Sequence, residues 1–498
     1  MLGNQLKNLL NFDHEKRFII FAERLICETT SLKKLLMNNG FMIYEYRNVE
    51  SFRIIYEEQL KRSDEKTAVI VSSDIYVPYD IRRSFKEVAI STAALFPNLD
   101  ADTVLRYLHD WDIIGFAAAF SYSDFSSAAK TEEYISNVVF SADMIERFCK
   151  AAAKRLKTDC ETAASYQDWI NIAKNKASIE YYMAMKKAAV PPTKRADSPA
   201  AKEIGIDLDF IDDAFNGFIA DGYGRLSSEV NRESPTILTK ALSVIMADRN
   251  AKSALIVMDG MSLFDFKAIS RYFEDMQFDY SCTFALIPTT TPISRQSLLS
   301  GKYPRELPKP FSLANEEKEF KSGAASFGLA PAQADYLRGY DAQISPSSKL
   351  AAIVINEVDD IAHGQRQGRM GMFNDMDLLG RSGKVQSLIR RLYALGFAVY
   401  ITSDHGNAKC AGAGGFRSGV EMESRSSRMA VLKDEAFANA LLIENTTEYQ
   451  GFYLDKSYRY FLCESGVSFD AKGADAMTHG GMSIDEVIVP FIRIRGIR

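Results

Sequence analysis

The first 80 residues alternate between short apolar runs and longer amphipathic ones. The runs RFIIF at Arg17–Phe21 and TAVIV at Thr67–Val71 have the consecutive apolar residues of buried strands, as does Phe41–Tyr46. Between them, Ser31–Asn39 and Val49–Arg62 carry apolar residues at helical spacing. This pattern predicts a small α/β N-terminal domain, a βαβαβ unit, over residues 1–80.

The pattern then changes to one of helices. Residues 81–189 contain long stretches such as SADMIERFCKAAAKRLK, with apolar residues at helical spacing, and we expect a helical domain there. Residues 190–250 are expected to form a linker followed by connecting helices, because VPPTKRADSPAAKEIG at 190–205 is rich in Pro, Ala and charge. Ser234 before Pro235 predicts the N-cap of a helix that reaches about Asp248.

Residues 251–498 alternate strands and helices to the end of the chain. Near-continuous apolar runs of this kind are typical of strands buried on both faces of a parallel or mixed sheet. The runs are Ala254–Val257, Cys282–Ile287, Leu350–Ile355, Ala398–Thr402 and Glu486–Ile494. A long helix is expected at Met376–Leu395. We therefore predict a doubly wound α/β domain, with ligands bound beyond the carboxyl ends of its strands.

Composition and charge narrow the class of protein. The chain has 498 residues, 47% of them hydrophobic, and a net charge of −5, which argues against a uniformly basic nucleic-acid binder but allows a local basic groove. We find no apolar stretch of the length that a membrane helix needs and no signal peptide, so we expect a cytoplasmic protein with no membrane partner. The six cysteines lack CxxC spacing and are expected to be reduced thiols.

Two polar strings follow the first predicted strands of this domain. In ALIVMDGMS, Asp259 comes just after a strand and before a glycine, which suits a carboxylate aimed at a ligand. In LIPTTTPISRQSLLSGKYP, Thr291 is expected to cap the helix Ile293–Ser300, where the helix dipole favours a bound phosphate. Arg295, one turn further, faces the same way and either touches the phosphate or is solvated, whereas Thr289 and Thr290 are expected to be structural.

Three further strings contain most of the remaining chemistry. Asp359 and His363 in INEVDDIAHG are four residues apart and would project from one helical face toward one ion. Asp404 and His405 in VYITSDHGN follow a buried strand, and His479 in MTHGGMSIDEVIVPF lies in a loop flanked by glycines. Each string alone is equally typical of a helix cap or a polar turn. Carboxylates gathered this closely would repel one another without cations between them, so we predict a centre for two divalent metal ions.

The ordered set of Asp, Thr, Asp-xxx-His, Asp-His and His resembles the alkaline phosphatase superfamily, and more closely its PglZ-domain branch. The phrases PTTTPISRQSLLSG, INEVDDIAHG, YITSDHGN and THGGMSIDEVIVPF carry this resemblance over roughly residues 250–498. The resemblance implies one metal held by Asp259, Asp404, His405 and the nucleophile Thr291. It implies a second held by Asp359, His363 and His479. Zinc is the metal it implies first, with manganese as the alternative.

The resemblance also implies an activity. An alkoxide of Thr291 would attack phosphorus and form a phosphothreonine, which water then hydrolyses. The leading hypothesis is a phosphodiesterase acting on nucleotides or nucleic acid, in bacteriophage defence of the BREX type with other defence proteins as partners. A phosphomonoesterase or phosphomutase is the alternative within the enzyme class. A non-catalytic, metal-stabilised subunit of a phage-defence complex is the alternative outside it.

Two accessory features complete the expectations. The insert at about residues 304–348 is expected to cap the site, with four aromatic residues that either stack on bases or pack the cap itself: Phe311, Phe327, Tyr336 and Tyr340. In VIVSSDIYVPYD, Asp74 ends a strand with Pro78 four residues later, which resembles a phosphoacceptor receiver domain. A receiver also needs an acidic pair after its first strand, where only Glu23 is present.

Overall fold

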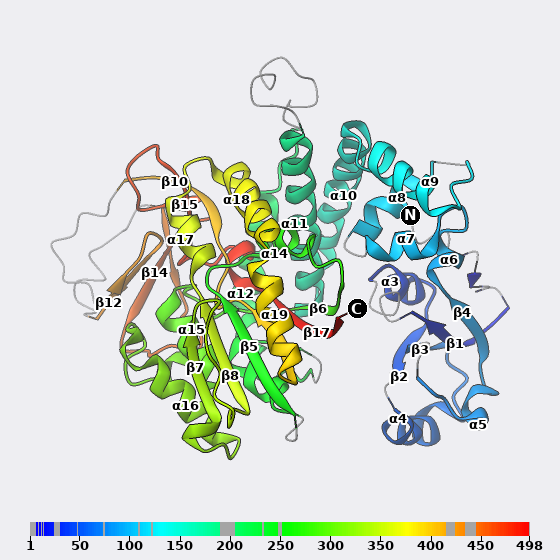
Figure 1. Ribbon diagram of the computed structural model, residues 1–498, viewed down its shortest axis with the longest axis horizontal. Coiled ribbons are helices and arrows are strands. Elements are labelled where there is room, and N and C mark those ends of the chain that lie inside the picture. The colour runs from blue at the N-terminus through cyan, green and yellow to red at the C-terminus, as the bar shows by residue number, and fades with distance from the viewer. Residues whose placement is uncertain are drawn as a thin grey trace. The chain divides into compact units, whose positions relative to one another are not determined.

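The computed structural model of the protein describes most of the chain in two compact units, Met1–Phe148 and Cys149–Arg498 (Figure 1). The described residues are 6–7, 9–10, 12, 14–23, 30–46, 48–72, 75–107, 110–120, 123–189, 205–231, 234–247, 251–414, 424–433 and 445–497. The expected linker at 190–205 lies outside them except for Gly205. The division between the units falls inside the helix α10, Ala142–Thr162.

A four-stranded parallel sheet forms the centre of the first unit. Its order is β2-β3-β1-β4, with bounds β1 Arg17–Ala22, β2 Met42–Tyr46, β3 Thr67–Ser72 and β4 Lys86–Ile90. The helices α3 (Thr30–Asn38) and α4 (Val49–Ile55) connect the first three strands, and α4 continues as a π-helical turn at Tyr56–Leu60. Ile19, Val69 and Phe52 are buried between the sheet and the helices, as their apolar runs predict.

This sheet bears on two points of the sequence analysis. Receiver domains have the flavodoxin-like order 2-1-3-4-5, whereas here β3 lies between β2 and β1, so the sheet does not have the receiver order, in line with the acidic pair that the sequence lacks. Glu23 accepts hydrogen bonds from the backbone N–H and the hydroxyl of Thr92, and Asp74 lies outside the described residues. The strand β4 lies inside the segment that we expected to be helical. Its residues are mostly exposed at the sheet edge, which leaves little apolar pattern to reveal it.

One short helix, α5, lies between β3 and β4, and further helices follow the sheet up to residue 188. The helices are α5 Tyr79–Arg82, α6 Thr92–Leu95, α7 Ala101–Arg106, α8 Trp111–Ala118, α9 Ala128–Tyr134 with a π-helical turn at Ile135–Val139, α10, and α11 Tyr166–Ala188. Among the described residues, no helix combines the length and apolar composition that crossing a bilayer would require.

A six-stranded sheet is the core of the second unit, with the order β6-β17-β9-β5-β8-β7. The four strands β9, β5, β8 and β7 are parallel, and β17 is antiparallel to both of its neighbours. The bounds are β5 Lys252–Met258, β6 Met276–Phe284, β7 Ala334–Arg338, β8 Leu350–Ile355, β9 Phe397–Thr402 and β17 Ile488–Ile497. Figure 1 shows α15 (Thr291–Ser300) and α16 (Glu316–Ser326) on one side of β5, β7 and β8, with α18 (Gly368–Ser382) and α19 (Lys384–Ala394) on the other.

Two predicted helices of this unit differ from the observed ones. The helix expected at Met376–Leu395 is two helices, because Gly383 between α18 and α19 has a φ of +71°. The helix expected from Pro235 begins later, as a 3₁₀ turn at Leu238–Lys240 followed by α13, Ala241–Ile245. Ile237 is extended and bridges to Phe284, so Ser234 is not an N-cap.

The segment that we expected to cap the site contributes to the sheet instead. Residues 334–338 form the edge strand β7, and α16 packs against α15. Of its aromatic residues, Phe311 makes an edge-to-face contact with Tyr458 at 5.6 Å between ring centroids, and the Tyr336 hydroxyl donates to Glu316 at 2.6 Å.

The remaining elements of the second unit surround the sheet. Helices α12 (Phe210–Asp221), α14 (Leu263–Ser270), α17 (Glu357–Gly364) and α21 (Ile484–Val487) precede or follow its strands, with 3₁₀ turns at Tyr223–Arg225, Pro304–Glu306, Leu313–Asn315 and Pro331–Gln333. Two smaller sheets have the orders β15-β10-β16 and β11-β12-β14-β13. Their bounds are β10 Ala408–Gly412, β11 Ser424–Arg425, β12 Met429–Leu432, β13 Thr446–Tyr449, β14 Arg459–Cys463, β15 Val467–Ser468 and β16 Asp475–Thr478.

Candidate metal centre

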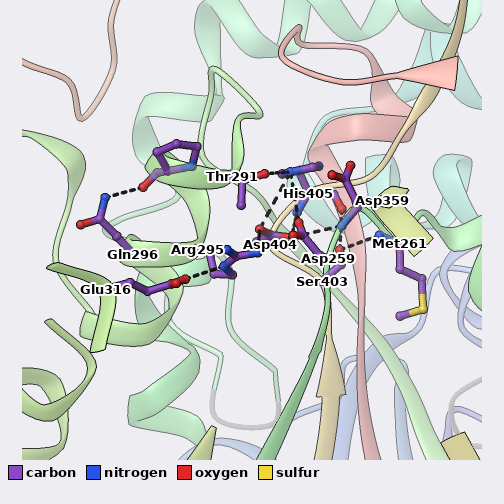
Figure 2. Close-up of polar contacts among 12 residues, drawn as sticks. Asp259, Met261, Thr291, Arg295, Gln296, Glu316, Asp359, Ser403, Asp404 and His405 are labelled. Carbon is purple, nitrogen blue, oxygen red and sulfur yellow. Dashed lines mark hydrogen bonds and ion pairs between the residues drawn. The ribbon is translucent and has the colours of Figure 1, made fainter. Parts of the chain in front are cut away.

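Three adjacent parallel strands carry carboxylates to one edge of the sheet. Asp259 directly follows β5, Asp404 and His405 follow β9, and Asp359 lies in the first turn of α17, just after β8. The carboxyl ends of neighbouring parallel strands meet at one edge, which is where this fold places its ligands. Side chains separated by up to 146 positions along the chain therefore meet in space (Figure 2).

A glycine allows two of these carboxylates to approach each other. Gly260 has a φ of +72°, and a Cβ atom there would lie 3.0 Å from Asp359 Oδ1 and 3.1 Å from its Cβ. Its backbone N–H also donates to Asp404 Oδ1 at 3.3 Å. The glycine after Asp259 is thus required for the close packing of the site, beyond the turn that it makes.

Thr291 reaches the same place from another segment. The N-cap of α15 is Thr290, one position earlier than predicted, and Thr291 is the first helical residue. Thr290 has the extended backbone angles typical of an N-cap. The Thr291 hydroxyl lies 3.0 Å from Nε2 of His405 (Figure 2). Nδ1 of His405 donates to the Gly406 carbonyl at 3.0 Å, so in the neutral ring Nε2 is an acceptor for the threonine proton.

His479 and His363 complete the cluster. His479 follows β16, and its Nδ1 donates to the Thr289 carbonyl at 2.9 Å, which leaves Nε2 facing Asp359 Oδ1 at 3.5 Å. His363 Nε2 lies 3.3 Å from Asp359 Oδ2 and 3.3 Å from His479 Nε2. Both rings of the pair His405 and His479 are buried and stack at 4.0 Å between centroids.

Two groups of side chains among the described residues have the spacing of metal ligands. Asp259, Asp404 and His405 form one, and Asp359, His405 and His479 form the other, with ligand atoms within 4.8 Å of one another in each. His405 belongs to both groups, whereas we predicted it as a ligand of the first metal alone. His363 stands at the edge of the second group with half of its side chain exposed.

Three buried oxygen atoms show that these residues fit a cation. Asp259 Oδ1, Asp359 Oδ1 and Asp404 Oδ2 have no hydrogen-bond partner among the described residues, although each is shielded from solvent. A buried carboxylate oxygen without a partner is costly, and a bound cation is the usual compensation. The carboxylate and imidazole donors at this site are those that zinc and manganese accept.

Arg295 has a different position from the one that its sequence suggests. Its side chain is 1% exposed, and its guanidinium donates to Asp259 and to Glu316 of α16, with Asp404 Oδ2 at 3.8 Å (Figure 2). Glu316 supplies the counter-charge that draws the arginine away from an open phosphate position. Burial works against the charge of Arg295, but the carboxylates Asp404, Asp259 and Glu316 outweigh it and raise the pKa of the guanidinium above its usual value.

The titration behaviour of the site follows from its burial. Burial and the neighbouring Asp259 carboxylate raise the pKa of Asp404 well above its ordinary value. Burial also opposes ionisation of Asp359, but the hydrogen bond from His363 and the nearby imidazoles outweigh it and hold the pKa of that carboxyl well below its usual range. Burial, reinforced by His405, lowers the pKa of His479 to about 4.

Sequence reasoning did not find the residues that hold the ligands in place. Glu316 pairs with Arg295 from the segment that we expected to be a cap. Asn407 donates to Asp265 at 2.6 Å and to the Gly260 carbonyl at 2.9 Å, which ties the loop after β9 to the loop after β5. Asn407 does stand in the SDHGN string, two residues after His405, and this proximity is the only signal of its role in the sequence.

The comparisons with known proteins agree with this geometry. The family described as "BREX system PglZ alkaline phosphatase-like domain" matches residues 239–494, slightly more than half of the chain. Among solved structures, murine ectonucleotide pyrophosphatase/phosphodiesterase 5 is similar over 48% of this chain and 87% of its own, with 14% identity and a TM-score of 0.37. The human protein of that name gives 15% identity over 48% and 87%, with a TM-score of 0.35.

A third similar structure is phosphonoacetate hydrolase from Sinorhizobium meliloti 1021 in complex with phosphonoformate, at 12% identity over 49% of this chain and 89% of that one, with a TM-score of 0.31. A search of curated proteins finds no match.

The sheet order, the ligand cluster at its edge and the family match define the C-terminal half as an alkaline phosphatase-like domain, the fold class that the sequence predicted. Membership of this class supports a phosphoester hydrolase. The chain belongs to the PglZ family, as its four motif phrases indicated.

Proposed function

We propose that this protein is a metal-dependent phosphodiesterase that acts on nucleotide or nucleic-acid substrates, with Thr291 as the nucleophile. One observation carries the proposal: a threonine hydroxyl at the start of a helix lies 3.0 Å from His405, beside three buried carboxylates that each have an oxygen without a hydrogen-bond partner. This set contains a nucleophile and the ligands for cations that can lower the pKa of its hydroxyl, which are parts that phosphoryl transfer needs.

The side chains divide into two ligand sets in this proposal. Asp259, Asp404 and His405, with Thr291, would hold one divalent cation, and Asp359, His363 and His479 the other, with zinc as the first choice and manganese as the alternative. When bound, the two cations supply Lewis-acid stabilisation of the phosphoryl oxygens and lower the pKa of a bound hydroxyl or water.

The charges at the first position are consistent with one divalent ion. Asp259, Asp404 and Glu316 are three carboxylates and Arg295 is one guanidinium, so the fully ionised set has two negative charges in excess. A divalent cation would neutralise that excess in a buried site. Arg295 therefore acts on the substrate only through Asp259 and Asp404 in this proposal.

Thr291 and its neighbours carry out the chemical steps. The hydroxyl is oriented toward the site by the first turn of α15, where the positive end of the helix dipole favours a phosphoryl group. In the loaded site Nε2 of His405 would be a ligand atom, because Nδ1 donates to the Gly406 carbonyl, so the Thr291 proton leaves to solvent. The threonine oxygen then attacks phosphorus, and the alcohol of the substrate departs with a proton from water. Water then attacks the phosphothreonine, the Thr291 oxygen leaves, and the hydroxyl is restored.

The test compares wild type with Thr291→Ala, Thr291→Ser and Thr290→Val on a bis-aryl phosphate diester and an aryl phosphate monoester. We expect Thr291→Ala to lower kcat by at least about 10³-fold, Thr291→Ser to retain part of it, and Thr290→Val to change it little. Metal analysis of the same samples should show two bound cations in each.

The two alternative functions predict different results in these assays. Faster turnover of the monoester than of the diester would replace the diesterase by a phosphomonoesterase or phosphomutase. Protein that holds two cations but hydrolyses no ester or nucleic acid would identify a non-catalytic, metal-stabilised subunit. The family description names the BREX system, and we propose that the protein acts in bacteriophage defence together with other defence proteins.

A further inference from the structure

The loop that carries His479 is held by a threonine that no chemical step uses. Residues 479–483 connect β16 to α21, and Thr289 contacts three of them. The Thr289 carbonyl accepts from Nδ1 of His479 at 2.9 Å, and its hydroxyl accepts from the N–H of Gly480 at 3.1 Å and donates to the carbonyl of Gly481 at 2.8 Å. One residue thereby fixes both the ring of His479 and the backbone after it.

A buried carboxylate holds the other end of the loop. Glu486 is fully buried, and its Oε1 accepts from the N–H of Gly481 at 2.9 Å and lies 3.3 Å from the Thr289 hydroxyl. Its Oε2 accepts from the N–H of Ser483 at 3.1 Å and from the Ser483 hydroxyl at 2.6 Å. A carboxylate with this many donors is rigidly placed, and so is the loop that provides them.

Arg428 makes the burial of this carboxylate possible. It is fully buried and donates to Glu486, and its other nitrogens donate to the carbonyls of Val467 at 3.0 Å and Glu464 at 2.9 Å. A Cβ atom on Gly481 would lie 2.7 Å from Cζ of Arg428, so the guanidinium packs directly against the loop. Without this partner, burying the charge of Glu486 would be strongly unfavourable.

We propose that Thr289 and Glu486 are positioning residues that fix His479 and thereby set the affinity of the second cation position, formed by Asp359, His363 and His479. This inference rests on the proposed metal-dependent function. The hydrogen bond from Nδ1 to the Thr289 carbonyl orients the ring and keeps Nε2 free as a ligand atom, and partners of this kind typically contribute about 10- to 100-fold to metal affinity.

The first test removes the Thr289 hydroxyl and keeps the volume of the side chain. Zinc is titrated into metal-stripped full-length protein, with heat measured by calorimetry and the ring signals of labelled histidine followed by NMR. The chain has five histidines, so those of His405 and His479 can be assigned with single His→Gln variants. Thr289→Val keeps the carbonyl that accepts from His479 and removes only the hydroxyl contacts to Gly480 and Gly481. We therefore expect zinc binding at the second position, reported by His479, to weaken by about 10-fold, the lower end of this range, while binding at the first position, formed by Asp259 and Asp404 with His405, persists.

Two matched variants separate positioning from packing. Thr289→Ser keeps the hydroxyl and should restore most of the affinity. Thr283 is fully buried, and its hydroxyl has no hydrogen-bond partner among the described residues, so Thr283→Val makes the same chemical change outside the loop and should leave zinc binding unchanged. Equal weakening in Thr289→Val and Thr283→Val, or no weakening in Thr289→Val, would overturn the inference.

A second variant tests the carboxylate without leaving an unpaired buried charge. Arg428→Met combined with Glu486→Gln removes both charges together, a change that folded proteins often tolerate. We expect the second position to weaken selectively, as in Thr289→Val. If wild type binds two zinc ions and neither variant loses affinity selectively at the second position, the inference is refuted and the proposed function stands. Wild type that binds neither zinc nor manganese refutes the proposed function itself.

Discussion

Arg295 is the residue whose position differs most from the expectation drawn from its spacing. The sequence places it one helical turn after Thr291, and the structure keeps that spacing within α15. What the spacing could not reveal is Glu316, which comes from another helix and pairs with the arginine inside the protein. Contacts between residues distant in sequence decide the partner of a buried charge, and a single sequence does not encode them in any local pattern.

Replacing Arg295 should therefore affect stability before it affects chemistry. Arg295→Met leaves Asp259 and Glu316 buried without their cation, and we expect the free energy of unfolding of metal-free protein to fall by about 3–5 kcal/mol. Urea unfolding measures this change. Added zinc should reduce the loss because it neutralises Asp259. Arg295→Met with Glu316→Gln should recover part of the stability, and a double variant less stable than the single one would contradict the ion-pair explanation.

At the scale of elements, the buried central strands were predictable, whereas the two edge strands β4 and β7 were not. The segments β5, β8 and β9 are buried along nearly their whole length, so their apolar runs mark them within one or two residues. The edge strands β4 and β7 each have only one fully buried residue, and neither was predicted. The ligand residues were identifiable because they follow the central strands, whereas the loops that bring them together were not.

Two glycines with the same backbone conformation give a matched test of how closely these loops approach. Gly260 has a φ of +72° and Gly383 a φ of +71°, but a Cβ atom would contact Asp359 only at Gly260. Alanine at either position should cost roughly 1–2 kcal/mol of stability through backbone strain. Gly260→Ala should in addition weaken zinc binding, measured by calorimetry. Equal zinc affinity in the two variants would show that the approach of Asp359 tolerates an added methyl group.

At the scale of the whole molecule, a buried charge network links helices of the second unit to the metal-binding loops. Lys176 of α11 pairs with Glu180 and Asp485, and Arg369 of α18 pairs with Asp485 and donates to Asn407 at 3.3 Å. Through the contact between Arg369 and Asn407, this network holds the loop after β9 in place. The sequence shows each charge but not their convergence, which arises only when α11, α18 and α21 pack together.

Asp212 at the edge of this network predicts how stability depends on pH. Burial, opposed by Lys176, raises the pKa of Asp212 from 3.8 to about 6. The folded state therefore holds the proton more tightly than the unfolded state, and the stability that this group contributes below pH 4 is lost as pH rises through 6. At pH 7 the ionised group costs up to roughly 3 kcal/mol.

Asp212→Asn should accordingly be more stable than wild type at pH 7 and equal to it near pH 4. Its amide oxygen can still accept from the N–H of Ile484, which Asp212 does at 2.8 Å. Urea unfolding at a series of pH values measures the free energy of unfolding of both proteins. The transition of the second unit is recognised because added zinc shifts it. A variant that is less stable than wild type at pH 7 would show that the carboxylate is needed in its ionised form.

The position of β17 has a consequence for how the molecule is made. This strand lies between β6 and β9 and directly follows the loop of His479 and the short helix α21. During synthesis, β6 stays unjoined to the rest of its sheet, and the last imidazole is missing, until His479 and β17, about two hundred residues after β6, have left the ribosome. A nascent chain that has not yet released β17 therefore cannot assemble the complete centre, so full loading with metal follows the emergence of this strand.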